Sequence, residues 1–403
     1  MNLALISKIS ILSYTSLAIA FLFSFLLSAL LGQDALGEYG AFLSASSIFI
    51  SILSLGSEKP ISKYAAKNQD FALSIFYSSI CYYFIFFILT SIVYFLIISI
   101  NIEEVTSISS IYYFSFMFAA ACVPVRLTQR ISRANGKPLV PIVVDILFLK
   151  IMPYILFLWM GFSYHETHTG ISEIYLLHIV FSILGAIYII YSNKSYLFVN
   201  NISQRIWPLY LHLKRIMVFW MTNIINVIQK EIDTLIVLYF FGPAIAGSVF
   251  LARRWYNALS MLNDSFAIAF EHEFSLAGQK KFTLYKKIRK VTVLASSILV
   301  FFSLPVFAIL EFYFRIIDGV FILILIFGVQ RVVENSVGPI FMYLSMQGRE
   351  KKVFENIFKT FILKVGVYLA ASYFSLSIYE IIFLICSGTV ILTYILFRRE
   401  YNA

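Results

Sequence analysis

The residues of this sequence that could do chemistry are charged side chains inside long apolar stretches. If these stretches cross a membrane, each such charge costs about 2.5–3.5 kcal/mol on insertion scales and must face a polar cavity or an ionic partner. The basic residues near the middle of a stretch, followed by the acidic ones, are Lys150, Lys230, Arg253, Arg254, Arg331 and Lys364, then Asp145, Glu231, Asp233, Asp264 and Glu334.

Two oppositely charged pairs have the spacing of neighbours on one helix. Lys230 and Asp233 are three residues apart, and so are Arg331 and Glu334. Side chains three or four residues apart on a helix lie side by side, so each pair is predicted to neutralise itself. Structural ion pairs are therefore one interpretation of these four residues.

The cations Lys150, Arg253, Arg254 and Lys364 are predicted to be the least neutralised. Lys150 lies five residues from Asp145, which places the two on different faces of an α-helix. Arg253 and Arg254 are adjacent and have no acidic residue within a helical turn. The alternative is that one or two of these cations reach the membrane interface because the predicted spans are misplaced.

A cationic cavity is the site that these residues suggest. Guanidinium groups bind phosphate oxygens with two hydrogen bonds, so the cavity would suit phosphate or pyrophosphate. A tryptophan beside the arginine pair could stack on a sugar ring, with ordinary packing as the alternative. The predicted substrate-binding residues are Lys150, Arg253, Arg254, Arg331, Lys364 and Trp255.

Three carboxylates, Glu231, Asp233 and Glu334, are predicted candidates for carrying a coupling ion. Desolvation disfavours the charged form of a carboxylate, which lets a buried one exchange protons or take up a cation. The ion could be H⁺ or Na⁺, and the sequence does not choose between them.

The composition predicts that membrane helices position these residues. Of the 403 residues 60% are hydrophobic and 13% are charged, and the mean hydropathy is +0.86. The apolar runs are too long and too uniform for the alternating strands of a barrel, which leaves helices of about 20 residues per crossing. About twelve spans are predicted, at 11–31, 39–56, 75–98, 108–127, 139–162, 171–191, 216–241, 243–270, 291–314, 319–346, 354–376 and 379–397.

The loops between these spans alternate in charge. Most of the 31 Lys and Arg residues fall in one set of connections and at the two ends, whereas the other set is short and mainly acidic. Short basic loops stay in the cytoplasm, so both termini are predicted to be cytoplasmic. The net charge of +10 is thus a topology signal and not a sign of nucleic acid. The basic cluster at 280–290 is expected to contact anionic membrane lipid.

The two halves of the chain repeat a glycine pattern. Gly32 and Gly37 follow the first span, and Gly242 and Gly247 follow the seventh at the same spacing. Because six spans are an even number, the halves would form parallel six-helix lobes, predicted at 1–200 and 201–403, with the substrate between them.

Other sites are not indicated. The three cysteines, Cys81, Cys122 and Cys386, have neither metal-ligand nor disulfide spacing. There is no nucleotide-binding motif and no soluble segment large enough for a catalytic domain. The sequence therefore predicts no enzyme, catalytic residue, cofactor or metal.

Two local motifs resemble a known transporter family. Leu30-Leu31-Gly32 with Leu36-Gly37-Glu38-Tyr39-Gly40, and later Glu231-Ile232-Asp233-Thr234 with Phe241-Gly242 and Gly247, are similar to the lobe openings of polysaccharide transporters. These belong to the multidrug/oligosaccharidyl-lipid/polysaccharide exporter superfamily, and the closest likeness is to O-antigen repeat-unit flippases. One departure is Ser248-Val249-Phe250, where the family usually has a Tyr.

The resemblance implies a V-shaped, two-lobed transporter of the bacterial inner membrane. It would flip undecaprenyl-pyrophosphate-linked oligosaccharide from the cytoplasmic to the periplasmic leaflet by alternating access, with the polysaccharide polymerase machinery as a possible partner. A drug/cation antiporter of the same superfamily is the first alternative, and it would favour an acidic cavity. A membrane-embedded polymerase or glycosyltransferase is the second, and it would need a large outer loop, whereas the longest predicted one is about 163–170.

Overall fold

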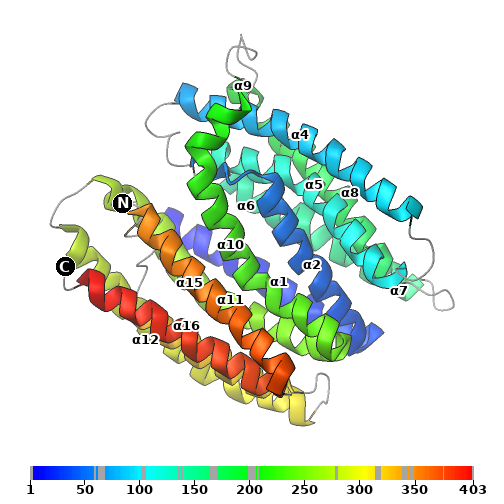
Figure 1. Cartoon of the computed structure of the whole chain (residues 1–403), viewed down its shortest axis with the longest axis vertical. Helices are drawn as coiled ribbons and strands as arrows, with labels where there is room; N and C mark the ends of the chain where they lie inside the picture. The colour runs from blue at the N-terminus through cyan, green and yellow to red at the C-terminus, as the bar shows by residue number, and fades with distance from the viewer. Residues whose placement is uncertain are drawn as a thin grey trace. The chain divides into compact units, whose positions relative to one another are not determined.

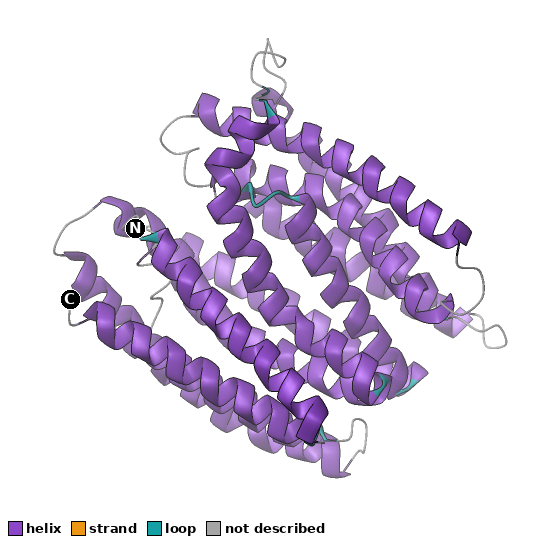
Figure 2. Ribbon diagram, in the orientation of Figure 1, coloured by secondary structure: helices purple, strands orange, loops and turns teal. Residues whose placement is uncertain are grey.

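The structure is a computed structural model in which the described residues form helices and short connections, without a strand (Figures 1 and 2). It describes residues 3–401 except 59, 62–68, 101–105, 135–136, 138, 164–169, 198–205, 207, 277–279, 314–318, 338–343, 345–348 and 375. The helices of the N-terminal half are α1 (Leu3–Leu31), α2 (Gln33–Leu53), α4 (Gln69–Ile100), α5 (Thr106–Ala134), α6 (Leu139–Ile146), the π-helix η1 (Leu147–Ile151), α7 (Met152–Ser163), α8 (Ile171–Ser192) and α9 (Lys194–Leu197). Those of the C-terminal half are α10 (Leu209–Phe241), α11 (Pro243–Leu276), α12 (Lys280–Ala308), the π-helix η3 (Ile309–Tyr313), α13 (Val320–Val337), α15 (Glu350–Phe374) and α16 (Ile378–Tyr401).

In their described residues the twelve predicted spans lie on helices, apart from a few residues at their ends, which confirms the all-helical membrane class. Residues 338–343 and 345–346 of the predicted span 319–346 lie outside the described residues, as do residues 314 and 375 of two other spans. Among the described residues, nine helical segments are long and apolar enough to cross a membrane. The three long helices outside that set are α10, α11 and α15, with 33, 34 and 25 residues. Each of them carries charged residues in its middle. Length therefore permits them to cross, and their charges are what sets them apart.

The chain divides into two compact units. Unit 1 comprises Met1–Gly40 and Ile232–Ala403, and unit 2 comprises Ala41–Glu231. In unit 1, α13 packs on α11, α12 and α16, while α1 packs on α11 and α15 on α16. In unit 2, α5 packs on α8, and α8 also packs on the α6–η1–α7 segment. The predicted lobe boundary near residue 200 stays a prediction.

The repeated glycines serve two different purposes within unit 1. Gly32 and Gly242 have φ of +89° and +85° at the junctions α1–α2 and α10–α11. This left-handed backbone conformation commonly ends a helix, and glycine adopts it with the least strain. Gly37 lies inside α2, where an added Cβ would overlap the carbonyl oxygen of Pro243. A Cβ on Gly247 would lie 2.9 Å from the carbonyl oxygen of Gln33. The second glycine of each copy thus allows α2 and α11 to approach backbone to backbone.

Gly37→Ala tests this close approach. The added methyl group collides with backbone, which cannot move aside as a side chain can, so we expect a loss of about 1–3 kcal/mol in stability. Gly366→Ala is the matched control, because a Cβ there meets nothing within 4 Å on the exposed side of α15, and alanine in a helix interior is favoured by about 0.5–1 kcal/mol. Thermal unfolding in detergent should rank Gly366→Ala at or above wild type and Gly37→Ala below it. Equal midpoints for the two variants would contradict the packing argument.

Candidate functional site

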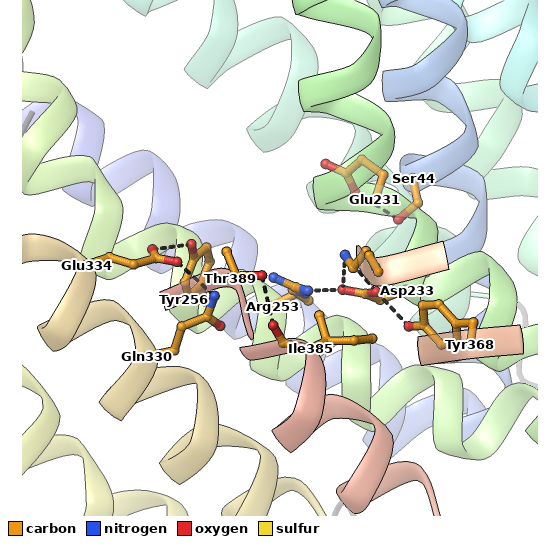
Figure 3. Close-up of polar contacts among 11 residues, drawn as sticks. Ser44, Glu231, Asp233, Arg253, Tyr256, Gln330, Glu334, Tyr368, Ile385 and Thr389 are labelled. Atoms are coloured by element: carbon orange, nitrogen blue, oxygen red, sulfur yellow. Dashed lines mark hydrogen bonds and ion pairs between the residues drawn. The ribbon is translucent and has the colours of Figure 1, made fainter. Parts of the chain in front are cut away.

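Asp233 is the centre of a buried charge cluster in unit 1. It is fully buried on α10, and its Oδ1 accepts hydrogen bonds from Tyr368 Oη at 2.6 Å and Lys364 Nζ at 2.7 Å. Its Oδ2 accepts from Lys364 Nζ at 2.8 Å and from Arg253 Nη2 (Figure 3). Arg253 comes from α11, and Lys364 and Tyr368 come from α15, one turn apart. The three long polar helices therefore meet at one carboxylate.

This arrangement corrects two sequence predictions. Lys230 is exposed, and Asp233 is ion-paired with Arg253 and Lys364 instead. These two are consequently among the neutralised cations and not among the least neutralised. The spacing of residues along one helix predicts partners on that helix alone. The partners of Asp233 instead lie on α11 and α15. With two cations on one carboxylate, the cluster carries a surplus of one positive charge.

A second cluster surrounds Glu334 on α13. Its Oε2 accepts hydrogen bonds from Arg331 Nη1 at 2.8 Å and from Tyr256 Oη at 2.6 Å, and its Oε1 accepts from Gln330 Nε2 at 2.8 Å. Arg331 also lies over the Tyr256 ring, 5.0 Å from its centroid. The predicted pairing of Arg331 with Glu334 is thus confirmed, and this cluster is electrically balanced.

Arg253 lies between the two clusters (Figure 3). Its guanidinium carbon is 4.3 Å from the centroid of the Phe327 ring and 5.5 Å from that of Tyr256, the tyrosine bound to Glu334. The Nη2 atom of the same guanidinium pairs with Asp233. The Nε atom of Arg253 is buried without a hydrogen-bond partner among the described residues. A change of charge at Asp233 or at Glu334 would therefore change the electrostatic energy of this one guanidinium.

Arg254 and Trp255 contact α1. Arg254 Nη1 donates to the carbonyl oxygen of Ala20 at 3.0 Å, and its guanidinium lies 4.6 Å from the ring centroid of Phe250. It makes no ion pair with a described residue, and its assignment to a cationic cavity stays a prediction. Trp255 packs edge-on against Phe21, with ring centroids 6.1 Å apart. Packing is therefore the role that the structure gives Trp255, and sugar stacking stays a prediction.

Lys150 in unit 2 is paired, contrary to the prediction from its spacing. Its Nζ lies 3.0 Å from Asp145 Oδ2. Residues five apart are on different faces of an α-helix, but η1 interrupts the helix at this point, and the N–H of Met152 binds the carbonyl of Leu147 five residues earlier. A π-helical turn is wider and brings residues five apart onto the same side.

Glu231 also lies in unit 2, as the last residue of the part of α10 that belongs to that unit. Its Oε2 accepts a hydrogen bond from Ser44 on α2 at 3.0 Å. The predicted coupling residues therefore have different surroundings: Asp233 is held by cations, Glu334 by a cation and neutral donors, and Glu231 by a hydroxyl group. Their role in ion coupling stays a prediction, as does a single cavity lined by all the predicted cations.

The sequence analysis missed the tyrosines and the glutamine of the site. Tyr368 follows Lys364 by four residues, and Tyr256 follows Arg253 by three, so each lies on the same helix face as a buried cation. Gln330 precedes Glu334 by four. A search for polar residues at helical spacing from each buried charge would have found all three.

Comparison with known proteins establishes the fold. No protein-family profile matches the sequence, and no curated protein does. Solved structures of multidrug MATE transporters of the MOP superfamily do match. A MATE transporter in complex with MaL6 is 15% identical, with 98% of this chain and 95% of that chain covered at a TM-score of 0.71. A mutant of the Vibrio cholerae MATE transporter VcmN is 15% identical, with 98% of each chain covered and a TM-score of 0.66.

A third solved structure has the same fold with a different pocket. A MOP superfamily transporter from Pyrococcus furiosus is 13% identical, with 98% of this chain and 94% of that chain covered at a TM-score of 0.64. Its binding pocket is described as having reverse polarity, which suggested a different function for that protein. At such identities the likeness establishes that this chain has the MATE transporter fold over nearly its whole length.

Asp233→Asn tests whether Asp233 holds the three helices together. The substitution leaves Arg253 and Lys364 buried without their carboxylate, and removing one partner of a buried pair costs about 3–5 kcal/mol. Lys230→Gln, on the same helix but exposed, is the charge-changing control and should leave stability within about 0.5 kcal/mol. Thermal unfolding in detergent measures both. Adding Lys364→Met to Asp233→Asn should recover part of the lost stability. Equal unfolding midpoints for Asp233→Asn and Lys230→Gln would show that Asp233 does not hold the three helices together.

Proposed function

We propose that this chain is a secondary transporter that exports an amphipathic substrate in exchange for H⁺ or Na⁺ by alternating access. Two features support the proposal: the MATE transporter fold, which extends over 98% of the chain, and charged clusters in the middle of long helices. Buried charges are costly in a membrane and usually mark an ion or substrate pathway. By the charge pattern of its loops, both termini would lie in the cytoplasm. The resemblance to polysaccharide transporters implies a bacterial inner membrane.

The observation that carries the proposal is the linkage of Asp233 and Glu334 through Arg253. Asp233 binds Arg253 directly, and Glu334 binds Tyr256, over whose ring Arg253 lies. Neutralising Asp233 would release two cations at once, from α11 and from α15. A buried network of this kind has two charge states with different preferred packing, and an ion that favours one state shifts the equilibrium between them.

A cationic drug is the substrate class that the solved neighbours favour. Two of them, an inward-facing and an outward-facing structure, are described as multidrug resistance MATE family transporters. An organic cation needs a carboxylate that it can approach. Glu334 in unit 1 is the residue that we assign to it, because one cation, Arg331, is bound to Glu334, whereas two cations are bound to Asp233. We therefore place drug/cation antiport first.

An undecaprenyl-pyrophosphate-linked oligosaccharide is the second candidate substrate. The surplus positive charge around Asp233 and the absence of an ion pair between Arg254 and a described residue favour an anionic group such as pyrophosphate. The Pyrococcus furiosus neighbour with a pocket of reverse polarity illustrates that this fold accommodates opposite charge. A flippase of this kind would work beside the polysaccharide polymerase.

Transport by Glu334→Gln tests the proposed coupling. The amide keeps the size of the side chain and one acceptor oxygen, while its NH2 group cannot accept and the side chain can no longer gain or lose the proton. We therefore expect transport to fall at least about tenfold with normal abundance in the membrane. The assay is complementation of a strain lacking the gene, reading both efflux of a cationic dye and the leaflet that holds lipid-linked oligosaccharide. Undiminished transport of both substrates would end the coupling role of Glu334.

Arg254→Gln separates the two substrate classes in the same strain. Loss of this guanidinium should abolish oligosaccharide flipping, because the pyrophosphate loses a positively charged partner. Dye efflux should stay within about twofold of wild type, because a cationic dye is not attracted by the positive charge of Arg254. Dye efflux that depends on the gene, with normal surface polysaccharide, would establish the antiporter. Cytoplasmic-side accumulation of the lipid-linked oligosaccharide without a change in efflux would establish the flippase.

A further inference from the structure

Three arginines share one face of α5 at the end predicted to be cytoplasmic. Arg126, Arg130 and Arg133 are spaced by four and three residues, which places them within about 60° around the helix. All three are partly buried, and Arg133 is the last residue of the apolar segment that ends there. The arginines therefore lie against protein on one side and at the depth of lipid headgroups on the other.

The acids beside this face do not balance it. Glu58 Oε2 accepts hydrogen bonds from both Nε and Nη2 of Arg130, at 3.2 and 2.8 Å. Burial alone would raise the pKa of the Glu58 carboxyl, but Arg130, Arg126 and Arg133 together hold that pKa below its usual value. The other nearby acid, Asp145, is paired with Lys150. Four cations thus face two carboxylates, which leaves a surplus of two positive charges within this group of six residues.

Arg133 and Arg126 form neither a hydrogen bond nor an ion pair with a described residue, whereas Arg130 is held by Glu58. Of the two, Arg133 lies at the end of the apolar segment. The nearest charges on its own helix are those of Arg130 and Arg126, which repel it. Asp145 and Glu58 attract this guanidinium from other helices, but they also face Lys150 and Arg130. An added anion would therefore stabilise Arg133 further, because its five donors have no acceptor among the described residues.

We propose that Arg130 and Arg133 form a binding site for the phosphate group of a membrane lipid. A guanidinium fork matches two phosphate oxygens, and one phosphate diester or pyrophosphate would offset the surplus charge. The position at the end of the apolar segment fits the headgroup layer of the bilayer. The same chemistry would accept a soluble pyrophosphate, so the source of the phosphate is decided by experiment. The site does not depend on the transported substrate, since binding can be measured without transport.

The test uses the full-length protein, stripped of lipid in detergent, and follows thermal unfolding during titration with two probes. The probes are phosphatidylglycerol, for a lipid headgroup, and inorganic pyrophosphate, for a free phosphate. We expect Arg133→Gln to weaken the stabilisation by phosphatidylglycerol at least tenfold in apparent affinity. The matched control is Lys351→Gln, an exposed cation at the start of α15, which removes the same charge and should behave as wild type. Should Arg133→Gln not fold, Arg133→Lys keeps the charge and should still bind several-fold more weakly, because an ammonium lacks the bidentate fork.

Each outcome bears on the proposal. A loss confined to Arg133→Gln with phosphatidylglycerol supports a lipid site, and the same loss with pyrophosphate supports a site for soluble phosphate. Equal losses in Arg133→Gln and Lys351→Gln would reduce the effect to overall charge and overturn the site. Unchanged titrations in Arg133→Gln with both probes would overturn it as well.

Discussion

The structure of unit 1 depends on the ion pairs at Asp233. A lone charge among apolar helices is expensive, and here one carboxylate, two cations and a tyrosine hydroxyl satisfy one another. The helices that bring them, α10, α11 and α15, are the three long ones that fall outside the clearly apolar set. Each would be a poor membrane helix alone. Their charged groups are stabilised because they pair with one another. The cluster therefore explains why these helices pack together and why they are more polar than the other long helices.

The sequence predicted the elements well and the site only in part. Uniform apolar runs of about 20 residues favour helices in a membrane, which is why the described residues of each predicted span lie mainly on a helix. The pair Arg331–Glu334 was predictable because both residues lie on one helix. The partners of Asp233 come from helices 20 and 131 residues away, and no spacing rule reaches that far. The pair Lys150–Asp145 escaped prediction because a π-helical turn has no clear signature in the sequence.

The glycine repeat was recognised from the sequence, but half of its meaning comes from three-dimensional packing. Gly32 and Gly242 end helices, as their positive φ values require. Gly37 and Gly247 lie within helices, at a crossing that leaves no room for a side chain. Gln33 reinforces the crossing, because its Nε2 donates to the carbonyl of Ala244 and to Ser248 Oγ at 2.9 and 2.7 Å. The first glycine of each copy thus ends a helix, and the second, five residues later, allows the next helix to make one close backbone contact.

The repeat in the backbone is not matched by a repeat in charge. Unit 1 buries Asp233 with cations from two other helices, whereas unit 2 holds Asp145 and Lys150 on one helical segment and places arginines on α5. Glycines fix how helices pack, and that requirement is the same in any copy of the scaffold. Buried charges instead serve a particular ion or ligand, so nothing in the packing obliges the two halves to share them. The fold is shared with structural neighbours that are 13–15% identical, and one of them is described as having a binding pocket of reverse polarity, so the same scaffold accommodates different buried charges.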